Sequence, residues 1–271
     1  MITKKQKKLG QVFLKDKTII KKIIKAGKVE SKDQILEIGP GRGILTKALL
    51  KTEANIVAVE KDQELVEFLK SFFKDKQNLK IIHADIRDLL KTNQFYTQYS
   101  ILNTQYKVIG NIPYYLTSHL LRLLLENPIN PSLIVLMIQK EVAERIIAQP
   151  PKMNLLSASV QFYAKPEIIC YVPRTAFSPK PKVDSAVIKI IPNLVIARSE
   201  ATRQSFFKII KSGFKQPRKL LINNLSKNLN LEKTYLQKMF LQLNMPINTR
   251  AQNLSIKQWI SLSSLLMKNI V

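Results

Sequence analysis

Short apolar runs alternate with amphipathic segments along the first part of the chain. The apolar runs predict buried strands, and the segments between them have apolar residues at helical spacing. The predicted strands cover residues 34–39, 55–60, 79–85, 106–110 and 132–138. The predicted helices cover residues 16–27, 44–52, 62–73, 117–126 and 139–148. This alternation predicts an α/β fold with a parallel, Rossmann-like doubly wound sheet and helices on both faces.

The pattern changes after Pro150 and Pro151. A short helix from residue 154 precedes two segments, 167–173 and 184–192, that could add antiparallel strands to one edge of the sheet. From about residue 193 the strands stop, and helical spacing covers residues 201–214, 218–228, 232–243 and 255–268. We therefore expect two domains: residues 1–192 around the sheet, and a small C-terminal all-helical domain over residues 193–271. No known pattern matches residues 193–205, which we interpret as a linker.

Positive charge dominates the composition. The chain has 44 Lys and Arg against 19 Asp and Glu, a formal net charge of +25. Residues 1–30 hold ten lysines and two acids, while residues 201–231 hold seven basic residues and no acid. Two such blocks favour a polyanionic partner, of which nucleic acid suits the pattern better than a membrane surface.

Several classes of protein do not fit the sequence. The single cysteine, Cys170, excludes an internal disulfide and a cysteine-based zinc site. The two histidines lack metal-ligand spacing, so no metal is predicted. The sequence has no run of 18 apolar residues, so no membrane span is predicted. Its basic N-terminal segment lacks the apolar core of a secretory signal peptide. We expect a cytoplasmic protein, and nothing in the sequence indicates more than a monomer.

Three of the seven glycines stand in 37-EIGPGRG-43, between a predicted strand and a predicted helix. Such a turn lets the backbone approach a ligand closely and points helix-start N–H groups toward it. A dinucleotide fingerprint needs glycine or alanine at position 44, which is Ile44, and no Gly-Lys-Ser/Thr of a Walker loop follows. We interpret Gly39 and Gly41 as part of a cofactor-binding turn of another kind, with a plain tight turn as the alternative.

Two acids stand at the ends of the next two predicted strands. Glu60, 21 residues after Gly39, is placed to accept hydrogen bonds from ribose hydroxyls. Asp85 is placed to accept from an adenine amino group; the alternative for both is a solvated strand-end acid. A carboxylate-lined cleft tolerates a cation and repels a polyphosphate. These residues together favour S-adenosyl-L-methionine, which combines adenine, ribose and a positive sulfonium.

The fourth predicted strand runs into the turn 111-NIPY-114. The Asn111 side-chain oxygen and the Ile112 carbonyl are two acceptors that can fix both hydrogens of an exocyclic base amine, so that its lone pair faces a methyl group. Pro113 fixes φ, and Tyr114 offers a flat face for an unstacked base. The chemistry then rests on positioning rather than on a strong base. The alternative is a Pro-Tyr turn packed for stability.

With these motifs, the chain resembles the ribosomal RNA adenine dimethyltransferase family. Within it, the resemblance is to the small-subunit branch, whose loss is tied to kasugamycin resistance. The resemblance covers nearly the whole length. Its segments are 10-GQVFLKD-16, 36-LEIGPGRGILT-46, 110-GNIPYYLTS-118, 177-FSPKPKVDSAVIKI-190, 213-GFKQPRKLL-221 and 250-RAQNLS-255.

The resemblance implies a role for each matching residue. Val12 and Leu14 would line the entry side of the cofactor, and Gly39 would lie under its methionine moiety. Phe177 would form a second aromatic wall for the target base. Position 12 is Val where the family usually shows Asn, and position 115 is Tyr where Asn is usual, so the contacts expected there are open.

The resemblance further implies an enzyme that dimethylates the N6 amines of two adjacent adenines near the 3′ end of 16S rRNA, within an immature small ribosomal subunit. Lys208, Lys211 and Lys215 are spaced to share one helix face, which we expect to dock the RNA. The predicted RNA-binding residues are Lys211, Lys215, Arg218 and Lys219. Two alternatives stay open: a large-subunit rRNA methyltransferase of the antibiotic-resistance type, and a non-catalytic assembly factor. The order of methylation and a checkpoint role in assembly do not follow from the sequence.

Overall fold

The computed structural model describes residues 12–98, 106–193 and 200–267. The chain forms two compact units. Unit 1 contains residues 1–143 and 166–192, and unit 2 contains residues 144–165 and 193–271. The lysines at positions 4, 5, 7 and 8 of the basic N-terminal block, and residues 194–199 of the expected linker, lie outside the described residues.

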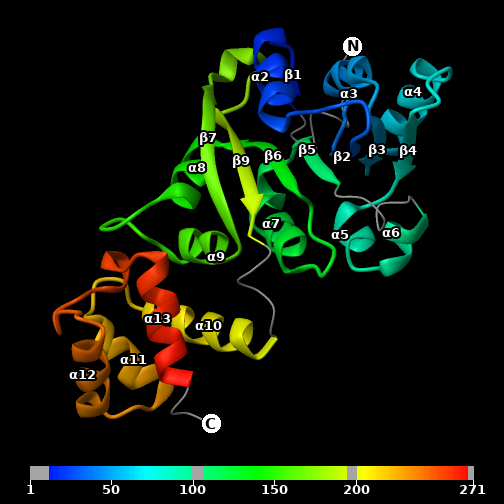
Figure 1. Cartoon of the computed structure of the whole chain (residues 1–271). Coiled ribbons are helices and arrows are strands. Elements are labelled where there is room, and N and C mark those ends of the chain that lie inside the picture. Colours follow the sequence, from blue (N-terminus) through cyan, green and yellow to red (C-terminus); the bar gives the residue numbers. More distant parts are fainter. Residues whose placement is uncertain (1–11, 99–105, 194–199, 268–271) are drawn as a thin grey trace. The chain divides into compact units, whose positions relative to one another are not determined.

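Unit 1 is built on a seven-stranded sheet (Figure 1). The strand order is β4-β3-β2-β5-β6-β9-β7. The bounds are β2 (Gln34–Ile38), β3 (Asn55–Glu60), β4 (Leu79–His83), β5 (Lys107–Asn111), β6 (Leu133–Gln139), β7 (Ala164–Val172) and β9 (Ser185–Pro192). Strands β2 to β6 pair in parallel, and β9 pairs with β6 antiparallel. The predicted doubly wound sheet and its antiparallel addition are confirmed.

Helices connect the parallel strands. Their bounds are α2 (Lys17–Gly27), α3 (Ile44–Leu49), α4 (Gln63–Phe72), α5 (Ile86–Leu89), α6 (Asn93–Gln98), α7 (Thr117–Glu126) and α8 (Lys140–Ile147). Asp16 and Asp62 start α2 and α4, because each side chain accepts hydrogen bonds from two N–H groups of the first turn. The chain winds from β2 toward β4 and then back through β5 to β6. Right-handed crossovers therefore place α3 and α4 on one face and α7 on the other.

The core follows the alternation of side chains along the strands. Ile35, Ile56, Ile109 and Val135 belong to one hydrophobic cluster, which includes the buried isoleucines of α2. Their neighbours in sequence point to the opposite face, where the leucines of α7 are buried. Strands buried on both faces explain the near-continuous apolar runs in the sequence.

A second, two-stranded sheet was not predicted. In it, β1 (Phe13–Leu14) pairs antiparallel with β8 (Phe177–Ser178). The Lys15 N–H donates to the Ala176 carbonyl at 2.9 Å and extends this ladder. Strands of two residues carry too few side chains for a periodic pattern. Three short 3₁₀ helices also belong to unit 1: η1 (Leu50–Thr52), η2 (Tyr114–Leu116) and η3 (Arg174–Ala176).

The secondary structure described in unit 2 is helical, apart from Ala164 and Lys165 at the start of β7. Unit 2 contains α9 (Leu155–Tyr163), α10 (Glu200–Gly213), α11 (Leu221–Leu229), α12 (Lys233–Gln242), η4 (Ala251–Asn253) and α13 (Ile256–Met267). This unit differs from the expected boundary at residue 193, because residues 144–165 belong to it. Phe162 of α9 stacks on Phe206 of α10 with ring centroids 4.0 Å apart, and both rings are buried. In the sequence α9 lies between two predicted strands. Periodicity therefore gave no sign that it packs against helices near the C-terminus.

Candidate functional site

Four strand ends lie in a row at one edge of the sheet in unit 1. The pairings align Glu60 with His83, Ile38 with Val59, and Ile38 with Gly110. The residues that follow, Asp85, Glu60, Gly39 and Asn111, therefore stand at the carboxyl ends of β4, β3, β2 and β5. The order of strands reverses between β2 and β5, which is where ligands bind in open α/β sheets. The pairings thus bring these residues, each predicted to follow or end a strand, to one edge of the sheet.

The glycine turn meets the Asn turn at this reversal point. Gly39 and Gly41 have φ of +67° and +59°, in the left-handed region that favours glycine. A Cβ on Gly39 would lie 3.4 Å from the Asn111 carbonyl oxygen, and one on Gly110 would lie 2.6 Å from the Ile38 carbonyl oxygen. Glycine at these positions lets the two turns approach each other closely. The space over Gly39 is a cradle that a side chain would fill.

Glu60 is held by the backbone around it. Its Oε1 accepts from the N–H groups of Lys61 and Asp62 at 2.8 and 3.0 Å, and its Oε2 accepts from the Gly41 N–H at 3.1 Å. The side chain is buried, and this burial raises its pKa, although the three N–H groups oppose the shift. Each carboxylate oxygen can accept two hydrogen bonds. Among the described contacts, Oε2 is the oxygen with capacity for a ribose hydroxyl.

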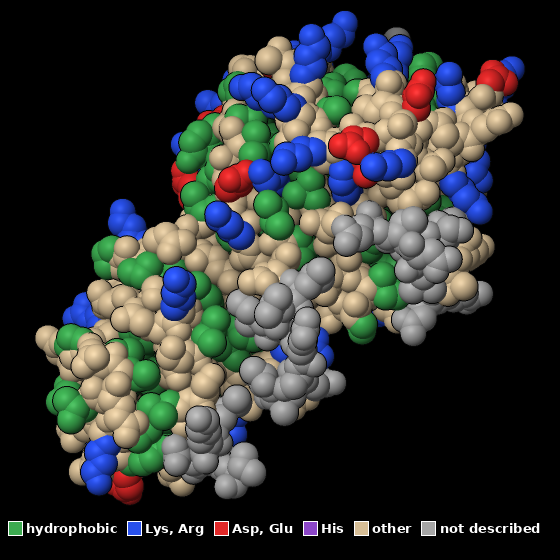
Figure 2. Space-filling model, in the orientation of Figure 1, with side chains coloured by type: hydrophobic (Ala, Val, Ile, Leu, Met, Phe, Trp, Pro, Cys, Tyr) green, Lys and Arg blue, Asp and Glu red, His purple; other side chains and the backbone are tan. Residues whose placement is uncertain are grey.

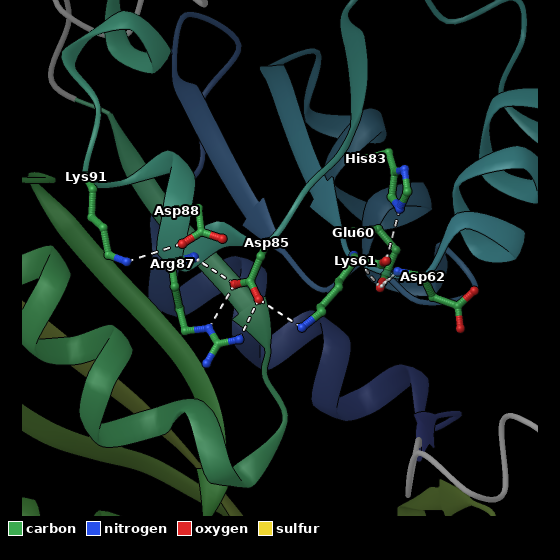
Figure 3. A network of polar contacts seen from close by, with 8 residues as sticks. All are labelled: Glu60, Lys61, Asp62, His83, Asp85, Arg87, Asp88 and Lys91. Carbon is green, nitrogen blue, oxygen red and sulfur yellow. Dashed lines mark hydrogen bonds and ion pairs between the residues drawn. The ribbon is translucent and has the colours of Figure 1, made fainter.

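Asp85 is held by cations instead (Figure 3). Oδ1 accepts from the N–H and the Nε of Arg87, both at 3.0 Å. Oδ2 accepts from the Arg87 Nη2 at 2.6 Å and from the Lys61 Nζ at 3.0 Å. The hydrogen bonds of Arg87 are the main reason that the pKa of Asp85 is far below its usual range. Sequence reasoning did not identify Lys61 and Arg87, because side-chain pairing leaves no periodic signal.

The turn after β5 is fixed on both sides. Pro113 has φ of −57° and precedes η2, and the Leu116 N–H donates to the Pro113 carbonyl at 3.0 Å. The Tyr114 hydroxyl lies 2.8 Å from the Oγ of Ser185, which is fully buried at the start of β9. Asn111 and Tyr114 are half-buried. The structure thus holds the Tyr114 ring in one orientation, through a residue that the sequence did not single out.

The N-terminal strand covers the glycine turn with a different residue from the two that the resemblance names. A Cβ on Gly41 would lie 3.2 Å from the Phe13 ring, and the Arg42 guanidinium lies 5.0 Å from the centre of that ring. Leu14 points into the core. Because side chains alternate along a strand, Phe13 points the opposite way, toward the turn. We expect any contact of Val12 or Leu14 with a cofactor to come from their backbone atoms, and this contact stays a prediction.

Phe177 lies in the hydrophobic core of unit 1. It pairs with Leu14 in the β1–β8 ladder, and its side chain is 3% exposed. In this structure the ring does not offer a face to a target base. The structure therefore does not bring Phe177 together with Tyr114 as a second aromatic wall, because the ring packs in the hydrophobic cluster that includes the isoleucines of α2.

A buried carboxyl, Glu37, lies beneath the glycine turn. It is fully buried on β2 between two apolar residues, and neither of its oxygens has a hydrogen-bond partner among the described residues. The hydroxyl and the N–H of Thr46 on α3 are close enough to favour the charged form, and they lower the pKa of Glu37. Burial raises the pKa of Glu37 to about 8, and the charge of Glu60 adds to the shift. Glu37 is therefore protonated at neutral pH.

Unit 2 carries the predicted RNA-docking residues on its surface. Lys211 is on α10, and Lys215, Arg218 and Lys219 are exposed in the turn of residues 214–220. The expectation that Lys208, Lys211 and Lys215 share one helix face is wrong for Lys215, because α10 ends at Gly213. A Cβ on Gly213 would lie 2.5 Å from the Trp259 ring, and Asn224 donates to the Gly213 and Gln216 carbonyls.

Basic side chains are spread over the face drawn in Figure 2, where acidic ones are few. In the described part of the chain, no three His, Cys, Asp or Glu residues gather where they could hold a metal ion. The helices that the structure describes include none with the length and apolar character needed to cross a membrane.

A family model described as ribosomal RNA adenine dimethylase matches residues 2–268. The chain belongs to this family. Methyltransferases of this family use S-adenosylmethionine. The expected family and the expected methyltransferase fold are confirmed.

Curated relatives within the family match most of the chain. The ribosomal RNA small subunit methyltransferase A of Rippkaea orientalis is 40% identical, over 96% of this chain and 97% of its own. The protein of the same name from Dehalococcoides mccartyi is 38% identical, over 94% of this chain and 86% of its own.

Two solved structures share the fold. A dimethyladenosine transferase from Plasmodium falciparum superposes with a TM-score of 0.79 at 27% identity, covering 94% of this chain and 98% of its own. The 23S rRNA methyltransferase ErmE superposes with a TM-score of 0.73 at 20% identity, covering 94% of this chain and 99% of its own. The second likeness concerns the fold alone.

Proposed function

We propose that this rRNA adenine dimethylase transfers methyl groups from S-adenosylmethionine to the N6 amines of two adjacent adenines near the 3′ end of 16S rRNA. The relatives named for the small ribosomal subunit support the choice of substrate. The segments 213-GFKQPRKLLINNL-225 and 250-RAQNLS-255 support it further, since they resemble the small-subunit branch. We place the protein in the cytoplasm, acting as a monomer on an immature small subunit.

One observation carries the proposal. Gly39 and Asn111 lie against each other where the strand order reverses, and the two acids stand at the ends of the next strands. These residues fit the methyl donor: the cradle over Gly39 suits its methionine part, Glu60 its ribose, and Asp85 its adenine amine. Gly41 shapes the same turn, and its N–H is held by Glu60. The bound donor would supply an electrophilic methyl group on a sulfonium.

Asn111 and the Ile112 carbonyl position the target amine. Ile112 is buried, and Pro113 restricts the backbone that follows, so this carbonyl is fixed in direction. In the first transfer to an adenine, these two fixed acceptors would hold both amine hydrogens and leave the nitrogen lone pair aimed at the methyl group. With the donor bound, a nitrogen–carbon bond would form as its carbon–sulfur bond breaks, and the methylated amine would then lose a proton to water. Tyr114, fixed by Ser185, supports the flipped base.

Unit 2 supplies the RNA-docking surface in this proposal. Lys211, Lys215, Arg218 and Lys219 are exposed, and residues 201–231 contain no acid that could neutralise them. Folded RNA is recognised largely through its phosphates and its shape, for which exposed long cations are suited.

A labelling experiment tests the proposal. The protein is incubated with methyl-labelled donor and either immature small subunits or naked large-subunit rRNA, and the label is mapped by primer extension and mass spectrometry. We expect label on two adjacent adenines near the 3′ end of 16S rRNA, and no label with the Asn111→Ala variant. Label on large-subunit rRNA would instead support the antibiotic-resistance type, and binding of subunits without any label would support an assembly factor.

A further inference from the structure

The carboxylate of Asp85 has no capacity for a further hydrogen bond in this structure. A carboxylate offers about four acceptor positions. Two donors of Arg87 occupy Oδ1, and Arg87 Nη2 and Lys61 Nζ occupy Oδ2. Figure 3 shows Asp85 between the two cationic side chains. An adenine amine can bind Asp85 only if one of these donors leaves.

The four donors differ in how readily they can leave. The Arg87 N–H belongs to the first turn of α5, which Asp85 caps, so it stays while the helix is formed. Lys61 makes a single contact from a side chain that is 64% exposed. The Arg87 guanidinium contacts both oxygens as a fork, and its side chain is 38% exposed. The surface lysine contact contributes little and leaves first, which opens one position on Oδ2. The Arg87 fork is a two-point, charge-assisted contact that still holds both oxygens, so it is the competitor that remains.

We propose that Arg87 competes with the adenine amine of the methyl donor for Asp85, and so sets how tightly the donor and its product are held. The inference rests on the proposed function, because it takes Asp85 as the adenine site. Arg87 is in this sense a residue that tunes binding, not a catalytic one. In the free protein it also keeps a carboxylate that is only 14% exposed paired with a cation.

Such a competitor suits an enzyme that methylates each adenine twice. Between transfers, S-adenosylhomocysteine, the product left by the donor, must leave and a new donor must enter. Product and donor share the adenine group, so tight binding of that group would slow exchange. A guanidinium that returns to Asp85 shortens the residence of the product, at the expense of equilibrium affinity.

The test measures the dissociation constant of S-adenosylhomocysteine for the Arg87→Met variant by calorimetric titration. This product lacks the sulfonium charge, so removing a positive charge nearby has little direct effect on it. Methionine keeps an apolar side chain of similar length but lacks the guanidinium that competes for Asp85. We expect binding to tighten about three- to tenfold, the range for one partly exposed charge-assisted contact.

Two controls isolate the contact with Asp85. Lys91→Met removes a neighbouring cation that pairs with Asp88 at 3.2 Å, and it should leave the dissociation constant unchanged. An S-inosyl analogue of the product has an exocyclic carbonyl oxygen on C6 in place of the amine. Its binding should not tighten in Arg87→Met. Unchanged or weaker binding of S-adenosylhomocysteine to Arg87→Met would overturn the inference.

A third variant separates this inference from the proposed site. If Asp85→Ala weakens S-adenosylhomocysteine binding while Arg87→Met changes nothing, only the competition is wrong. If Asp85→Ala leaves binding unchanged, the adenine lies elsewhere, and both the adenine assignment and the inference fail. Transfer of label to 16S rRNA, measured as above, tests the proposed reaction independently of either result.

Discussion

Unit 1 and unit 2 hold their polar groups in opposite ways. In unit 1, Glu60 accepts three backbone N–H groups, Asp85 accepts four donors, and Tyr114 is fixed by a buried serine. In unit 2, the cations proposed to bind RNA extend from an exposed helix end and turn. Methyl transfer depends on fixed geometry, whereas attraction to phosphates depends on the number and spacing of charges. The contrast therefore supports separate tasks for the two units.

The largest expected effect is on chemistry in unit 1. We expect Asn111→Ala to lower turnover by about 100-fold or more, because one preorganised polar contact to the target amine is lost. RNA affinity should be nearly unchanged. Single-turnover methyl transfer to small subunits measures the first quantity, and filter binding the second. His119→Ala, an exposed residue on α7, is the matched control. Wild-type turnover by Asn111→Ala would remove this residue from the mechanism.

The next effect is on donor binding. Glu60→Ala should weaken binding of the donor by about 1.5–3 kcal/mol, or roughly ten- to 150-fold, since the ribose loses a charged acceptor. Part of this loss comes from the Gly41 N–H, which Glu60 holds. Equilibrium titration provides the measurement, with Glu67→Ala, an exposed residue on α4, as control. A donor dissociation constant equal to that of the wild type would mean that the cofactor lies elsewhere.

A smaller effect concerns stability and also separates the units. Both buried carboxyls among the described residues, Glu37 and Glu60, belong to unit 1. The pKa of Glu37 is raised from 4.5 to about 8 in the folded protein, so the folded state holds a proton that the unfolded state has lost between these values. Stability is then fully present below pH 4.5 and falls as pH rises toward 8. The slope is about 1.4 kcal/mol for each pH unit.

Glu37→Gln should remove most of this slope. Wild-type protein should lose roughly 2 kcal/mol of unfolding free energy between pH 6 and pH 8, whereas the variant keeps only the smaller contribution of Glu60. Urea denaturation at both pH values, followed by circular dichroism, measures the difference. Equal slopes in the two proteins would show that Glu37 is ionised in the folded state.

Periodicity was enough to predict the strands of the seven-stranded sheet, most helices and the residues at the ends of those strands. The segment 117–126, for example, matches α7 residue for residue. The misses involve long-range contacts, which no local pattern encodes. The β1–β8 ladder buries Phe177 and directs Phe13 to the glycine turn, and Trp259 fixes Gly213 at the end of α10. The fork of Arg87 on Asp85 likewise depends on side-chain geometry that spacing alone does not reveal.

The most direct test of the division of tasks replaces Lys211, Lys215, Arg218 and Lys219 with Gln. Small-subunit binding is measured over a range of salt concentrations, and donor binding is measured on the same protein. The matched control replaces four exposed lysines of unit 1, at positions 51, 70, 74 and 76, so that the net charge is equal.

We predict that the unit 2 variant binds subunits more weakly, with the slope of log affinity against log salt reduced by about 0.7–0.9 for each lost phosphate contact. Its donor binding should match that of the wild type, and the control variant should retain the wild-type slope. A wild-type salt slope in the unit 2 variant would contradict the account, and would direct attention to the basic N-terminal block as the RNA-docking surface.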